Sequence, residues 1–151
     1  MATHTTVAAF RAALFAALVA DASLGGAGVQ VEYGEPAADR RDELVWLGNS
    51  VTSGINEPNA MVSGRRKRDE DYFVELVVQC ASRSTCSANE IRGAAMVGAV
   101  EDILALDTTL SVDGIIWASI ETFEWETDLS GDAGTPRTTV TISIQVRGRL
   151  A

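Results

Sequence analysis

The sequence predicts an α+β fold, in which a mostly antiparallel sheet is packed by two helices in a single domain. Three patterns predict it. Residues 72–125 read as a strand, a capped helix and a second strand, residues 5–20 have helical periodicity, and residues 138–147 alternate between apolar and polar side chains. A chain of 151 residues is long enough to bury about two-thirds of its unfolded surface as one domain (1–151).

The first predicted helix spans residues 5–20. Thr5 or Thr6 is a suitable N-cap, and alanine fills many of the positions that follow. Its apolar residues recur with helical spacing on one stripe: Val7, Phe10, Leu14, Leu18, with Phe15 and Val19 beside them. The glycine-rich segment 24–28 ends it, and this segment is not a dinucleotide-binding fingerprint because it follows a helix instead of a strand.

Two short strands are predicted next, at residues 29–33 and 44–47, with Trp46 in the core. Residues 48–71 then read as a long loop. Loops of this length inside a compact domain are functional, are disordered or conceal an element, and residues 51–55 are a candidate edge strand continuing 44–47.

A block of four bases lies near the end of this loop, and three acids follow it. The bases are Arg65, Arg66, Lys67 and Arg68. One interpretation is a nucleic-acid patch, although no aromatic residue is interleaved as a stacking platform. A second is a solvated hairpin entry, and a third is an arm that pairs with a neighbouring subunit.

The central unit begins with a strand, 72–79, which places Tyr72, Val74, Leu76 and Val78 on one face. Ser87 and Glu90 match a capping box and predict the start of a helix that ends near Leu106. After Gly114, an aromatic-rich strand at 116–126 is expected to form an antiparallel hairpin with 138–147.

The net charge of −9 is distributed unevenly. No Lys or Arg occurs between Gly93 and Pro136, whereas acids recur through this segment: Glu101, Asp102, Asp107, Asp113, Glu121, Glu124, Glu126, Asp128 and Asp132. Such a surface repels phosphate and disfavours nucleic-acid binding there, but it is also compatible with a solvated face that only aids solubility.

Catalytic and metal-binding patterns do not emerge from the sequence. There is no phosphate-binding loop, nucleophile elbow or calcium loop, and the one histidine, His4, lies at the N-terminus. Cys80 and Cys86 fit neither a metal pair nor a disulfide framework, so we expect a buried thiol at a strand end and a loop thiol. We therefore expect that this chain is not an enzyme and binds neither a cofactor nor a metal ion.

We also expect no membrane segment, because no apolar run approaches the roughly 20 residues that a span needs. The N-terminus lacks the charged region of a secretion signal, and Arg11 interrupts its apolar run.

The order of elements resembles a known family. That order is a helix, a strand with Val31-Glu32-Tyr33-Gly34, a strand with Val45-Trp46-Leu47-Gly48, a long loop, a basic stretch entering Tyr72-Phe73-Val74, a helix and a terminal hairpin. In this order of its elements the chain resembles the tail-terminator and neck proteins of long-tailed bacteriophages. The resemblance implies a virion protein, present in the host cytoplasm during assembly, that forms a ring of about six subunits. That ring would end tail-tube growth and bind the major tail tube protein and a head-completion or connector protein.

Two site assignments follow from the resemblance. An acidic lumen face at Glu121, Glu124, Glu126 and Asp128 would let double-stranded DNA pass without specific binding. The 48–71 loop, with Arg65, Arg66, Lys67 and Arg68, would be an assembly arm. One alternative is a head-completion (stopper or adaptor) protein; another is a small cytoplasmic ligand-binding protein with a pocket around Trp46, Trp117 and Trp125.

Overall fold

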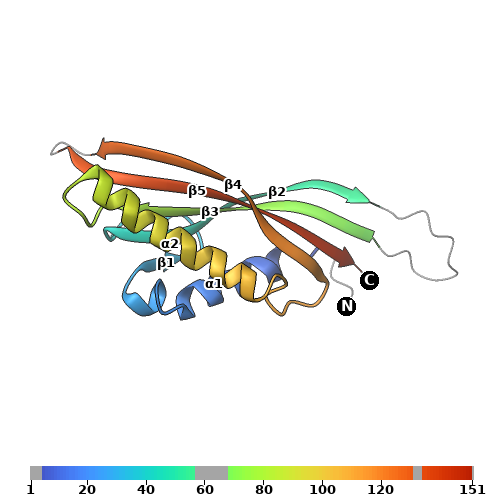
Figure 1. The fold of residues 1–151 in the computed structure, drawn as a ribbon. Coiled ribbons are helices and arrows are strands. Elements are labelled where there is room, and N and C mark those ends of the chain that lie inside the picture. Colours follow the sequence, from blue (N-terminus) through green and yellow to red (C-terminus); the bar gives the residue numbers. More distant parts are fainter. Residues whose placement is uncertain (1–4, 57–67, 131–133, 151) are drawn as a thin grey trace, which may run out of the picture.

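A computed structural model describes residues 5–56, 68–130 and 134–150. The elements in chain order are α1 Val7–Ala20, the short 3₁₀ helix η1 Gly25–Ala27, β1 Gln30–Glu32, β2 Glu43–Asn56, β3 Arg68–Cys80, α2 Cys86–Leu106, β4 Ile115–Ser130 and β5 Thr135–Leu150. They form one five-stranded sheet with both α-helices on the same side (Figure 1).

The strand order is β1-β2-β3-β5-β4. The pairs β2–β3, β3–β5 and β5–β4 are antiparallel, and only the three-residue strand β1 runs parallel to its neighbour β2. The predicted α+β class, the mostly antiparallel sheet, the two packing helices and the terminal hairpin are confirmed.

The main core lies between the helices and the face of the sheet that they cover, which we call the helix face. Alternate residues of β3 and β5 point into it, as their period of two predicts: Tyr72, Val74, Leu76, Val78, Val140, Ile142, Ile144 and Val146 are all buried. The helices contribute Phe10, Leu14 and Leu18 from α1 and Met96, Val97 and Val100 from α2. Burial of these stripes stabilises both helices, because most helical stability in proteins comes from tertiary packing of an apolar face.

A small second cluster lies on the opposite face of the sheet, which we call the open face. Leu44, Trp46 and Val77 pack together there, and the guanidinium of Arg40 lies 5.7 Å from the Trp46 ring centroid. Trp46 is only 7% exposed, so its assignment to a core is confirmed.

The start of α1 is held by a buried carboxylate from β3. Glu70 is 3% exposed and accepts hydrogen bonds from the Thr6 backbone N–H and, at 2.6 Å, from the Thr6 hydroxyl, which also contacts the Tyr72 hydroxyl at 3.1 Å. A carboxylate at a helix N-terminus is stabilised by the helix dipole. Gly148 belongs to this arrangement, because a Cβ there would lie 2.5 Å from the Thr6 hydroxyl oxygen.

The expectation that no apolar run is long enough for a membrane is wrong on length and composition. The segment Val7–Ala27 has 21 residues and a mean hydropathy of 1.7, which is long and apolar enough to span. In this structure its residues Phe10, Leu14, Leu18 and Leu24 are fully buried in the main core. Arg11 donates hydrogen bonds to Gly48 O at 2.7 Å and to Ser50 Oγ at 2.8 Å.

The predicted capping box of α2 is also wrong. The helix begins at Cys86, and Thr85 is the N-cap, with extended φ and ψ and a hydroxyl that accepts from the Ala88 N–H at 3.2 Å. Ser87 lies inside the first turn, and Glu90 instead accepts from the Thr127 hydroxyl on β4. Cys86 is therefore a helix residue and not a loop thiol, whereas Cys80 is buried at the end of β3 as expected.

The predicted 48–71 loop is mostly strand. β2 continues to Asn56 and β3 begins at Arg68, so the candidate edge strand at 51–55 is confirmed. Ser50 to Asn56 pair with Asp69 to Val74, with a bulge around Gly48 and Asn49 and another at Ser53. These polar residues form a strand because β3 supplies hydrogen-bond partners that no local pattern shows.

Candidate functional site

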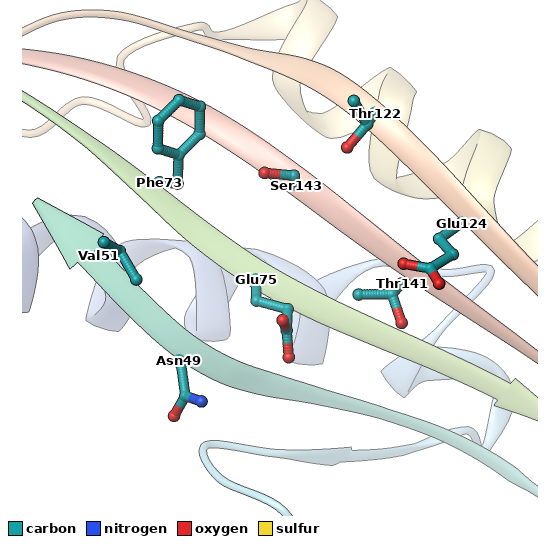
Figure 2. A pocket seen from close by; sticks show the side chains of 8 residues that line it. All are labelled: Asn49, Val51, Phe73, Glu75, Thr122, Glu124, Thr141 and Ser143. Carbon is teal, nitrogen blue, oxygen red and sulfur yellow. The ribbon is translucent and has the colours of Figure 1, made fainter. Parts of the chain in front are cut away.

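The helices leave the open face of the sheet uncovered (Figure 1). A shallow hollow of about 360 Å³ crosses four of its strands, and Figure 2 shows the side chains that line it: Asn49, Val51, Phe73, Glu75, Thr122, Glu124, Thr141 and Ser143. The lining is dominated by hydroxyls and two carboxylates around Phe73 and Val51. Val51 is 62% exposed although it is apolar.

Three of the four acids assigned to the lumen face lie on this open face. Glu124, Glu126 and Asp128 stand opposite Thr141, Thr139 and Arg137 of β5, whose side chains alternate with the buried ones. Asp128 differs from the other two because the Arg137 guanidinium lies 3.4 Å from its carboxylate. Within the described residues, Glu124 and Glu126 have no ion pair, so their charge is available to a partner or to solvent.

The fourth acid, Glu121, occupies a β-bulge. Ile120 pairs with Ile144 and Thr122 with Ser143, so Glu121 is an extra residue without a partner on β5. A second bulge at Ile116 has the same form. Each bulge shifts the alternation by one residue, which explains the mixed pattern of 116–126: Trp117 points to the open face, while Phe123 and Trp125 point to the helix face.

One end of the open face is neutralised by ion pairs between β3 and β5. Arg147 donates to both Asp71 oxygens at 2.7 and 3.0 Å, and Arg149 does the same to Asp69 at 2.7 and 3.1 Å. The hydrogen bonds from Arg149 lower the pKa of Asp69 below its usual range. Two of the three acids that follow the basic block in sequence, Asp69 and Asp71, therefore form ion pairs across the sheet. The unpaired negative charge is concentrated toward the β4–β5 hairpin.

The assembly-arm assignment falls mainly outside the described residues, because Arg65, Arg66 and Lys67 lie there. Arg68 is the first residue of β3 and pairs with Leu150 of β5. The structure thus places one of the four bases at the sheet and leaves the arm a proposal.

The three tryptophans of the ligand-binding alternative do not surround one pocket. Trp46 is buried in the second cluster, and Trp117 lies on the open face 5.9 Å from the Arg147 guanidinium carbon. Trp125 is on the helix face, beside a hollow that is lined by Ser87, Glu90, Ile91 and Ala94 of α2. The bulge at Glu121 is what separates Trp117 from Trp125.

Sequence reasoning missed the apolar surface beside that hollow. Ile91, Phe123, Trp125 and Leu129 are 71%, 39%, 46% and 66% exposed. The signal was present in Ile91, which falls off the buried stripe of α2, and in the two aromatics of β4, whose face depends on the bulge. Among the described residues, no group of three or more His, Cys, Asp or Glu side chains could hold a metal ion.

No family model and no curated protein matches the sequence. The fold, by contrast, has a counterpart among solved structures. It is similar to a chain from the virion of a native gene transfer agent (GTA) particle, with a TM-score of 0.57 and 18% identity, over 97% of this chain and 100% of that chain. The two chains share a fold.

Proposed function

We propose that this chain is a structural virion protein that caps the head-proximal end of a phage tail tube as a ring. It ends tube polymerisation, joins the tail to the head connector and lets double-stranded DNA pass. The observation that carries the proposal is the fold similarity to a virion chain, which extends over 97% of this chain and 100% of that chain. The order of elements in the sequence supports the terminator role within the virion.

The open face supports a conduit. DNA carries a dense negative charge, so a channel wall that binds it would hold the genome in place. A wall bearing unpaired carboxylates, such as Glu124 and Glu126, repels phosphate and favours passage. We therefore assign the open face to the lumen and the helices to the outside of the ring.

The proposal is tested with purified protein and polymerising tail tube protein. Native mass spectrometry and negative-stain images should reveal a closed ring, alone or on the tube end, with a hole wider than the roughly 20 Å diameter of a DNA duplex. Added in increasing amounts, the protein should shorten the tubes and leave one capped end. A protein that stays monomeric and leaves tube length unchanged would overturn the proposal.

The same experiment distinguishes a tail terminator from the alternative, a head-completion protein. A ring that binds the portal or adaptor but ignores tail tubes would be a stopper or adaptor. The arm is tested in parallel by replacing Arg65, Arg66, Lys67 and Arg68 with glutamates. If this variant still yields full-length capped tails, these bases do not dock on the tube or on a neighbour.

A further inference from the structure

Two edges of the sheet have no strand beside them in the described part of the chain. One is the outer edge of β4, the last strand in the order, which is 16 residues long. The other is the outer edge of β2 beyond Trp46, because β1 pairs only with Leu44 to Trp46. Arg11 covers Gly48 and Ser50 with its hydrogen bonds, so the free portion begins at Val51. Unpaired edges expose a row of N–H and C=O groups that can accept another strand.

The two edges differ in charge. From Leu44 to Asn56, β2 contains no charged residue, whereas β4 carries Glu121, Glu124, Glu126 and Asp128. Like charges directly opposite one another destabilise a strand pair. Two β4 edges that met in a two-fold contact would place these acids against one another. An uncharged β2 edge accepts β4 without that repulsion.

Both edges also expose apolar side chains, and on the helix face each edge has at least one. On β2, Val51 stands opposite Phe73 on the open face, and Ile55 stands opposite Glu70 on the helix face; they are 62% and 58% exposed. On β4, Phe123 and Trp125 are exposed on the helix face. If β2 of a second copy added to the β4 edge, its Ile55 would lie on the helix face and cover Phe123 and Trp125.

We propose that the β4 edge of one subunit pairs with the Val51–Ile55 edge of β2 in a second copy of this chain, so that the sheet continues from subunit to subunit. This contact uses two different surfaces, and repeated heterologous contacts of this kind close into a ring when the rotation allows. The inference rests on the proposed ring and deepens it by naming the interface. It also places Glu124 and Glu126 beside each junction.

The first test is cross-linking. In a Cys86→Ser background, where Cys80 is fully buried, Val51→Cys and Glu124→Cys are made separately and together, and each protein is treated with a short bis-maleimide. The double variant should give a ladder from dimer to ring size on denaturing gels, and each single variant should stay monomeric. Dimers from either single variant, without a ladder from the double variant, would overturn the pairing.

The second test changes charge at the β2 edge. Val51→Asp should keep the fold, because this side chain is 62% exposed, yet weaken assembly about tenfold or more, because the new carboxylate faces Glu124 and Glu126 of β4 on the open face. Leu106→Asp is the matched control, since Leu106 is 90% exposed at the end of α2, in a hollow that it shares with Ala13 and Ala17 of α1, and it should assemble like the wild type.

A third test asks whether a compensating charge change on β4 restores assembly. Adding Glu124→Lys/Glu126→Lys to the Val51→Asp variant should recover rings, because opposite charges then face each other on the open face. Rings that form equally well in the Asp variant would overturn this interface and leave the proposed function standing. A wild-type protein that is monomeric both alone and with tail tube protein would overturn both.

Discussion

At the scale of single residues, Glu70 shows how a charged side chain becomes part of a core. It lies in the acidic end of a charged block, where sequence patterning places it in solvent, yet it accepts two hydrogen bonds from Thr6. Burial of a carboxylate is tolerated because these donors and the helix N-terminus replace water. The position therefore ties α1 to β3 and to Gly148 of β5.

We predict that Glu70→Ala destabilises the fold by about 2–3 kcal/mol, because it leaves the buried Thr6 N–H without its acceptor. Urea unfolding measures the change. Glu75→Ala is the matched control: Glu75 is on the same strand but on the open face, and its loss should change stability by less than about 0.5 kcal/mol. Equal effects of the two substitutions would contradict the assigned role.

Glu43 and Arg92 join the start of β2 to α2 through two hydrogen bonds of 2.8 and 2.9 Å. These bonds from Arg92 lower the pKa of Glu43 below its ordinary 4.5. A depressed carboxyl pKa contributes stability that is present above the unfolded-state pKa and is lost as pH falls through the folded-state pKa.

Arg92→Gln should therefore cost about 1 kcal/mol near neutral pH, and the difference from wild type should shrink as pH falls below about 4.5. Thermal unfolding at a series of pH values measures it. Arg83→Gln, which removes a nearby charge without a hydrogen bond to Glu43, should have a smaller effect. A gap between Arg92→Gln and wild type that persists unchanged at low pH would contradict this account.

At the scale of elements, the two ends of helix α2 are set by different factors: the local sequence pattern predicts its C-terminal end, and tertiary contacts decide its N-terminal end. Its apolar stripe predicts the helix and its C-terminal end correctly, but the N-terminus is set by Thr85 and not by the Ser87–Glu90 pattern. The buried Asn89 fixes this start, since its amide donates to Pro136 O at 2.8 Å and its oxygen accepts from the Arg83 N–H at 2.9 Å. Contacts with β5 thus select one of two plausible caps.

Thr85→Ala should lower stability by about 1 kcal/mol, because the Ala88 N–H loses its acceptor, while Ser87→Ala should be nearly neutral. Chemical denaturation of both variants provides the comparison. The reverse order of effects would mean that the capping box forms after all.

The strands β2 and β4 are longer than their sequence patterns predict, for the same physical reason. Bulges at Gly48–Asn49, Ser53, Ile116 and Glu121 interrupt the period of two, so alternation no longer identifies one face. In β4 this moves Phe123 and Trp125 to the helix face and leaves Glu124 and Glu126 on the open face. The sequence alone shows only a mixed pattern of apolar and polar residues, because the position of a bulge depends on pairing with the neighbouring strand.

At the scale of the whole molecule, the sheet has one face covered by helices and one open face, and two of its edges have no neighbouring strand among the described residues. The open face is polar and carries unpaired acids at one end and arginine-paired acids at the other. That division suits the ring that we propose, in which the inner wall repels DNA and copies contact one another at the edges.

Reversing the charge of the wall should make it bind DNA. We predict that Glu121→Lys/Glu124→Lys/Glu126→Lys rings retain double-stranded DNA in a filter-binding or anisotropy assay, with an affinity that falls by about a thousandfold between about 50 and 200 mM salt. Wild-type rings should show no retention under the same conditions. The control variant Glu101→Lys/Asp102→Lys carries new charge on an exposed part of α2 and should remain close to wild type. Equal binding by both variants would argue against an inward open face.

The sequence by itself determined the α+β class, the two helices, the terminal hairpin and the buried stripes of Phe10, Tyr72, Met96 and Ile142, because these depend on periodicities of 3.6 and 2 within one segment. Three of the acids that it assigned to one face, Glu124, Glu126 and Asp128, lie on the open face, and their place in a lumen stays a proposal. Only the tertiary structure decided that residues 48–56 are strand, that Asp69 and Asp71 pair with arginines of β5, and that Glu70 holds α1. These outcomes depend on partners distant along the chain, and so do the bulges that decide which side chains share the open face.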